Sequence, residues 1–136
     1  MTDTDDKLYK IAGIGRDMIA IQLDLASKQP MEALNDTWVL GYCFGMLDAL
    51  AQRAKLDQYP DGLGLITIGF IELISGGQAN RTDELLGADM VKKALASQTD
   101  TRFLEGNQAG GTDLFAWCAD TKKAPLALSS HLRSAG

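Results

Sequence analysis

The chain has 136 residues, of which 46% are hydrophobic and 23% are charged. A chain of this length buries about two-thirds of the surface that it exposes when unfolded, so one core is sufficient, and the composition argues against wholesale disorder. The formal net charge is -5, and the lysines and arginines are scattered instead of forming a patch. Because phosphates are neutralised by clustered basic residues, the sequence indicates no nucleic-acid partner.

Signals for export, membrane insertion and metal binding are all weak. The first ten residues contain aspartates where a secretory signal carries a positive patch, so we expect a cytoplasmic protein. The longest apolar run, residues 63–74, is shorter than the ~20 residues that a membrane-spanning helix needs, and we expect no membrane contact. Cys43 and Cys118 are far apart, with no histidine at metal-ligand spacing. They predict free thiols, no metal site and no cofactor.

Two helices are predicted in the first part of the chain. Apolar residues at helical spacing predict a helix from about Asp5 to Lys28, and Pro30 marks its end, because the residue before proline is pushed out of helical geometry. A second helix is expected to begin at Asn35 or Asp36 and to continue to about Ala54. It is apolar on two opposite sides, which is typical of a helix between neighbours, and we expect it to be the central element.

The second part of the chain also favours helices. Residues 63–74 are apolar almost all round, and their β-branched residues leave a strand open, but their length and the following Ser75-Gly76-Gly77 favour a buried helix. Further helices are predicted over about 81–97, from Asp100 onward, and in a short segment after Pro125 that otherwise docks on the core. The predicted fold is therefore an all-α, compact, single domain of five or six helices over residues 1–136.

An internal repeat is the most informative pattern in the sequence. When the chain is shifted against itself by 65 residues, four residues of one predicted helix fall on four residues of another: Trp38, Gly41, Gly45 and Asp48 on Phe103, Gly106, Gly110 and Asp113. The same shift lays the first predicted helix over the fourth. We interpret this as a duplication of two pseudo-symmetric halves, about 5–75 and 81–136.

The paired glycines predict a close helix crossing. Glycines four residues apart lie on one face and leave no side chain to hold a neighbouring backbone away. One interpretation is that the two helices cross within the chain at Trp38, Gly41, Gly45, Phe103, Gly106 and Gly110, around a pseudo-two-fold axis. The other is that the same faces meet in a homodimer, and the first is favoured.

Asp48 and Asp113 are the carboxylates related by the repeat. A carboxylate near a tight crossing is costly unless it is hydrogen-bonded, so each is expected to pair with donors on an adjacent helix, for example Arg16 and Arg81. The alternative is that the two carboxylates converge on a shared cavity, where they would perform acid-base chemistry or hold a cation. Asn107 and Gln108 would then lie at the lip of a small polar pocket.

No pattern in the sequence predicts catalytic residues. His131 is the only histidine and lies near the C-terminus, so it supports neither a zinc site nor a triad and is expected at the surface. Glu72, alone on an apolar helix, is expected to face solvent. Trp38 and Tyr42 are expected in the core.

The sequence therefore favours a non-enzymatic interaction or adaptor protein, which binds a protein partner or a second copy of itself. The alternative is a small-molecule-binding protein or enzyme that uses Asp48 and Asp113 in a cavity between the two helical halves. Convergent polar groups in one concave site would favour the alternative, whereas a hydrophobic surface patch would favour the interaction protein.

Overall fold

Seven helices and no strand make up residues 3–135, the part of the chain that the computed structural model describes. The helices are α1 (Asp3–Leu25), α2 (Pro30–Ala33), α3 (Thr37–Arg53), α4 (Asp61–Ser75), α5 (Arg81–Ala96), α6 (Thr101–Ala119) and α7 (Ala127–Ala135). The predicted all-α fold class is confirmed, and the described residues form seven helices instead of the expected five or six, because the four-residue α2 was not predicted. Because residues 63–74 lie inside α4, the strand interpretation of that segment is wrong.

Side-chain caps explain where several helices begin. Asp36 accepts a hydrogen bond from the backbone N–H of Trp38 at 2.8 Å at the start of α3, and Asp100 performs the same role for α6. Asn80 and Asp83 form a reciprocal capping box at the start of α5. Each cap satisfies backbone N–H groups that the first turn of a helix leaves free.

Two boundaries differ from the sequence prediction. Helix α1 ends at Leu25 instead of Lys28, and Pro30, which was expected only to end that helix, begins the four-residue helix α2. Proline is tolerated at this position because the N–H group that it lacks would have no partner in the first turn of a helix. At the other end of the chain, α7 begins at Ala127, two residues after Pro125.

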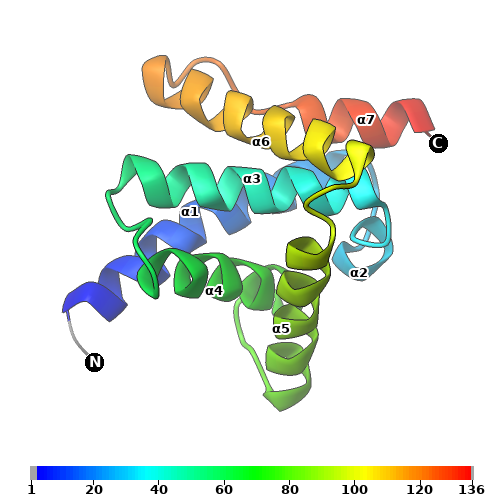
Figure 1. The fold of residues 1–136 in the computed structure, drawn as a ribbon. Helices are drawn as coiled ribbons and strands as arrows, with labels where there is room; N and C mark the ends of the chain where they lie inside the picture. The colour runs from blue at the N-terminus through cyan, green and yellow to red at the C-terminus, as the bar shows by residue number, and fades with distance from the viewer. Residues whose placement is uncertain (1–2, 136) are drawn as a thin grey trace.

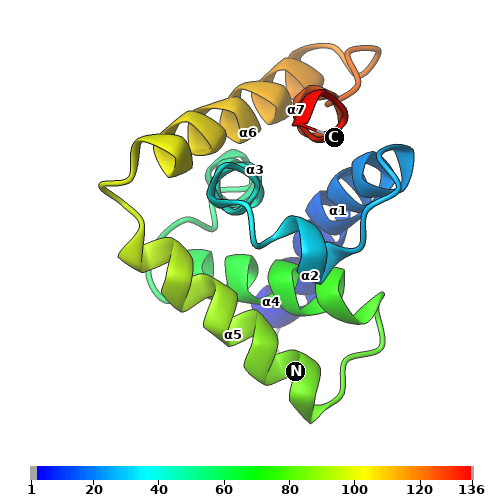
Figure 2. The ribbon, with the colours of Figure 1, turned by 90° about the vertical axis from the view of Figure 1, so that its right-hand side faces the viewer.

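Helix α3 lies at the centre of the fold, as the sequence predicts. Most of its residues are buried, on every side of the helix except the one that carries Phe44, Asp48 and Gln52. In Figures 1 and 2, α6 and α1 flank α3, and α4 packs between α1 and α5. Helix α7 returns along the molecule and packs against α1 and α6. This arrangement makes the pair formed by α3 and α6 the frame on which the polar side chains below are placed.

Candidate functional site

Helices α3 and α6 run side by side in the same direction, and their backbones touch (Figure 1). A β-carbon added to Gly41 or Gly45 would overlap the carbonyl oxygen of Phe103 or Asn107, respectively. A β-carbon on Gly106 or Gly110 would overlap the carbonyl oxygen of Trp38 or Tyr42. The glycine faces are therefore occupied within the chain, so the structure does not support the interpretation that they form a homodimer interface.

These contacts obey the shift of 65 residues that relates the two segments in the sequence. The shift converts the contact of Gly41 with Phe103 into that of Gly106 with Trp38, and it converts the contact of Gly45 with Asn107 into that of Gly110 with Tyr42. A pseudo-two-fold axis along the helix pair produces this exchange. It follows that each side of the α3–α6 pair has a counterpart on the other side.

On one side of the pair, Asp113 holds the start of α7. Its Oδ2 atom accepts a hydrogen bond from the Tyr42 hydroxyl at 2.6 Å and one from the backbone N–H of Ala127 at 3.0 Å. Ala127 is the first residue of α7, so Asp113 satisfies a free N–H group at a helix N-terminus. We call this side, defined by Tyr42, Asp113 and the first turn of α7, the α7 groove.

A second acceptor completes the α7 groove. The fully buried Gln22 of α1 donates a hydrogen bond to the Tyr42 hydroxyl at 2.9 Å, and its Oε1 accepts one from the backbone N–H of Ser129 at 3.1 Å. Burial and the hydrogen bond to Asp113 raise the pKa of Tyr42 well above its ordinary value, so the phenol remains protonated and donates. Leu128 and Leu132, which belong to α7, are buried.

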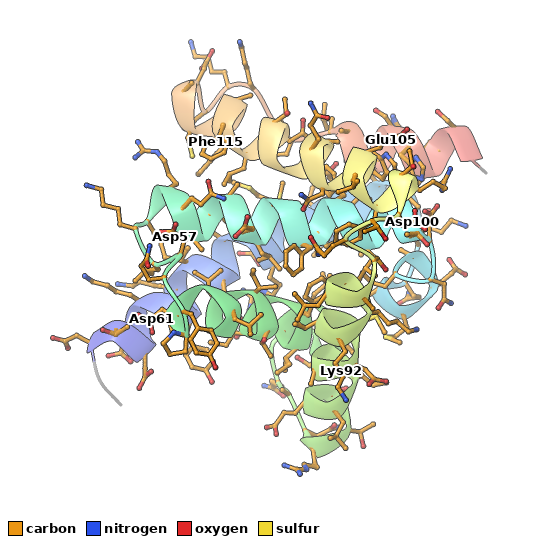
Figure 3. All side chains as sticks on the ribbon, viewed as in Figure 1. Asp57, Asp61, Lys92, Asp100, Glu105 and Phe115 are labelled. Carbon is orange, nitrogen blue, oxygen red and sulfur yellow. The ribbon has the colours of Figure 1, made fainter. Side chains whose placement is uncertain are left out.

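On the other side of the pair lies a groove of about 580 Å³. We call it the open groove; its walls come from α3 and α6, and its lining includes Asp48, Gln52, Asn107, Gln108, Thr112 and Phe115. Phe115 lies where α6 passes over the C-terminal half of α3 (Figure 3). Neither lysine nor arginine lines this groove, so its charge is negative.

Two acceptors of the open groove are incompletely satisfied. Burial raises the pKa of Asp48, although its carboxylate accepts a hydrogen bond from the Gln52 side chain at 2.9 Å. The side-chain Oδ1 of Asn107 is buried and has no hydrogen-bond partner among residues 3–135. The shift of 65 residues relates Asn107 to Tyr42 and Asp48 to Asp113, so the same two positions line both grooves.

The predicted site residues are therefore only partly brought together. Asp48 and Asn107 share the open groove, with the exposed Gln108 on its rim, whereas Asp113 is engaged by Tyr42 and α7 in the α7 groove. The two carboxylates thus have different surroundings instead of the shared cavity of the alternative interpretation. Asp113 does pair with a donor on an adjacent helix, as expected, but the donor is the Tyr42 hydroxyl and not an arginine.

Arginines do not perform the predicted role. Arg16 lies 3.0 Å from Asp17 and 3.6 Å from Glu72, and Arg81 lies 3.9 Å from Glu84, so neither arginine is paired with Asp48 or Asp113. The expectation that Glu72 faces solvent is wrong, because its side chain is only 18% exposed. Glu72 lies in the last turn of α4, and nothing in the sequence around it indicates that its carboxylate is covered.

His131 is packed against the core instead of being free at the surface, which corrects the sequence expectation. Its ring stacks on Trp38 with ring centroids 4.0 Å apart, and its Nε2 lies 3.0 Å from Oδ2 of Asp36. Arg102 also donates a hydrogen bond to Asp36, at 3.3 Å. Sequence reasoning missed this cluster and the role of Gln22, since the partners are distant in sequence and only the return of α7 brings them together.

Other groups are structural or give no site. Cys43 is completely buried, and burial raises the pKa of its thiol to about 12, so it is an unreactive core residue. No group of three or more histidine, cysteine or acidic side chains in residues 3–135 is arranged to hold a metal ion. Within the same range, every helix is too short or too polar to cross a membrane.

Comparisons with protein-family models, with curated proteins and with solved structures find no match to this chain. The open groove therefore has to be interpreted from its own chemistry.

Proposed function

We propose that this protein is a binding protein whose ligand places a positively charged hydrogen-bond donor in the open groove, with Asp48 as its anchor. The observation that supports this most directly is the buried Oδ1 of Asn107, which has no hydrogen-bond partner in the described part of the chain. It lines the same groove as the partly desolvated carboxylate of Asp48. A donor bound at Asp48 would satisfy that carboxylate, and it would reach Oδ1 of Asn107 once this side chain, whose oxygen has less than 1 Å² of accessible surface, turns toward the groove.

Energetics support a ligand for this groove. A buried acceptor without a partner destabilises a fold by about 1–3 kcal/mol, and a carboxylate removed from water is also unfavourable unless it is paired. Residues that break a stability rule without local compensation are typical of functional sites. The absence of lysine and arginine from the groove lining leaves its negative charge for a ligand.

The side chains of the groove suit binding better than catalysis. A carboxylate and carboxamides accept hydrogen bonds and orient a donor, and the residues that line this groove supply neither a histidine nor a cysteine. We therefore favour a non-enzymatic role. The alternative with two catalytic carboxylates loses its support, since Asp113 already binds Tyr42 and α7.

The proposal is tested with n-butylammonium and its neutral counterpart n-butanol, titrated into isotopically labelled protein and followed by NMR. We expect saturable shifts of the backbone amides of Asn107, Gly111 and Thr112 with n-butylammonium only. Asp48→Asn should weaken this binding by about tenfold or more, because a charged hydrogen bond contributes roughly 1.5–3 kcal/mol.

Asp89→Asn is the matched control, since Asp89 is an exposed carboxylate on α5 and outside the groove lining. This variant should bind n-butylammonium as the wild type does. Shifts that do not saturate, equal binding by the Asp48→Asn variant, or equal binding of n-butanol would each overturn the proposal.

A further inference from the structure

The occupied α7 groove shows what kind of structure its counterpart fits. In the α7 groove, Asp113 accepts the N–H of Ala127, and Gln22 accepts the N–H of Ser129. Two side-chain acceptors thus hold two of the N–H groups that every helix leaves free in its first turn. Positive partial charge at a helix N-terminus adds to the attraction of the Asp113 carboxylate.

The open groove repeats one acceptor of the α7 groove and adds another. Asp48 stands at the position related to Asp113, and Asn107 stands at the position related to Tyr42. The position related to Gln22 is Gly87, which lies against Ile71 and has no side chain to offer. In the open groove the second acceptor is therefore the unpartnered Oδ1 of Asn107.

The remaining walls of the open groove suit the body of a helix. Phe115, Ala49 and Ala116 supply apolar surface beside the acceptors, and the leucines at the second and sixth positions of α7 are buried in the core. The groove carries a carboxylate and no basic residue, so its charge is complementary to the positive end of a helix and not to the negative end.

From this equivalence we infer that the open groove binds the N-terminal turn of a helix of a partner protein, with the first free N–H groups of that helix on Asp48 and Asn107. The inference rests on the proposed function and names the source of the donor. The partner helix carries no side-chain cap of its own and presents apolar residues at its second and sixth positions, as Leu128 and Leu132 do in α7.

The experiment uses a synthetic peptide of residues 125–134, which contains all but the last residue of α7, added to the full chain. The peptide is acetylated, so that its donors at the N-terminus are backbone amides, and a staple between positions 130 and 134, which are exposed in α7, keeps it helical. In each molecule of the protein, the chain's own α7 fills the α7 groove. Only the open groove is left for the added peptide. NMR shifts report which groove is occupied.

We expect saturable shifts of Asn107, Gly111 and Thr112, with the resonances of Leu128 and Leu132 unchanged. A peptide methylated on the nitrogen of residue 127 loses one donor and should bind about tenfold more weakly or worse. Asp48→Asn and Asn107→Leu should weaken binding of the unmodified peptide to a similar extent, whereas Asp89→Asn should not.

The outcomes separate this inference from the proposed function. If n-butylammonium binds but the peptide does not, the helix partner is wrong and the proposed function stands; if neither binds, both are wrong. Equal binding of the methylated peptide, or shifts confined to Leu128 and Leu132, would overturn the inference, because the peptide would then be held without amide donors or would replace α7 in its own groove.

Discussion

Trp38 and Gly106 lie so close across the α3–α6 crossing that a β-carbon on Gly106 would overlap the Trp38 carbonyl oxygen. The contact is repeated between Phe103 and Gly41, with the roles of the two helices exchanged. Because backbone meets backbone at both places, neither side can yield as a flexible side chain would. The crossing therefore fixes the spacing of α3 and α6, and with it the geometry of both grooves.

Replacement of Gly110 by alanine tests this crossing. Overpacking of a tight contact lowers the free energy of unfolding by about 1–3 kcal/mol. Because the added methyl group would meet backbone atoms, which cannot move aside, we expect Gly110→Ala to lose about 3 kcal/mol or more. Gly111→Ala is a control in the same helix, since its β-carbon would approach nothing closer than 4.0 Å. Alanine is about 1 kcal/mol better than glycine inside a helix, so this control should be neutral or stabilising in urea unfolding. Equal stability of the two variants would contradict the crossing.

Loss of the Asp113 carboxylate should release α7. Asp113→Ala leaves the Tyr42 hydroxyl and the Ala127 N–H without their acceptor, and we expect the free energy of unfolding to fall by about 2–3 kcal/mol. In Asp113→Ala, the α7 amides should exchange their hydrogens faster than in the wild type, whereas the α4 amides should be unaffected. Asp113→Asn keeps an acceptor oxygen and should retain part of the protection. Unchanged exchange in Asp113→Ala would show that the carboxylate does not hold the helix.

Acid should weaken the contact of His131 with Asp36. Burial raises the pKa of Asp36, but hydrogen bonds from His131, the Trp38 backbone and Arg102 outweigh it and keep this pKa below the ordinary 3.8. The stabilisation is therefore present above the unfolded-state value and is lost as the pH falls through the lower folded-state value.

Asp36→Asn isolates this charge, because asparagine also caps helices well. Urea unfolding between about pH 6 and pH 2 should show a steeper loss of stability for the wild type than for this variant. Asp89→Asn should follow the wild type. Parallel curves for Asp36→Asn and the wild type would exclude Asp36 as a source of acid sensitivity.

Asp48 should have the opposite effect on stability. Burial raises the pKa of Asp48, which means that the folded state disfavours the charged form. Asp48→Asn should therefore raise the free energy of unfolding at pH 7, and the gain should shrink as the pH falls and the wild-type carboxyl becomes neutral. Thermal unfolding of the wild type and of Asp48→Asn, at pH 7 and at an acid pH, measures the difference in stability between the two proteins. If Asp48→Asn is more stable and no longer binds n-butylammonium, Asp48 serves function at the expense of stability. If the variant is less stable, Asp48 has a structural role.

The sequence predicted the helices and the crossing pair from local patterns. Periodic apolar residues, the Asn80 cap and the glycines after α4 act within a few residues, so their effect is visible in a single sequence. The spacing of Gly41, Gly45, Gly106 and Gly110 also predicted which faces meet, since only glycine permits such an approach.

Only the tertiary structure decided what surrounds each polar side chain. Asp48 and Asp113 are equivalent in the sequence pattern, yet α7 packs on the groove of Asp113 and leaves that of Asp48 open. The contacts of Gln22 with Ser129 and of Asp36 with His131 join residues far apart along the chain. Hydrogen bonding of this kind depends on how whole helices pack, which no local pattern encodes.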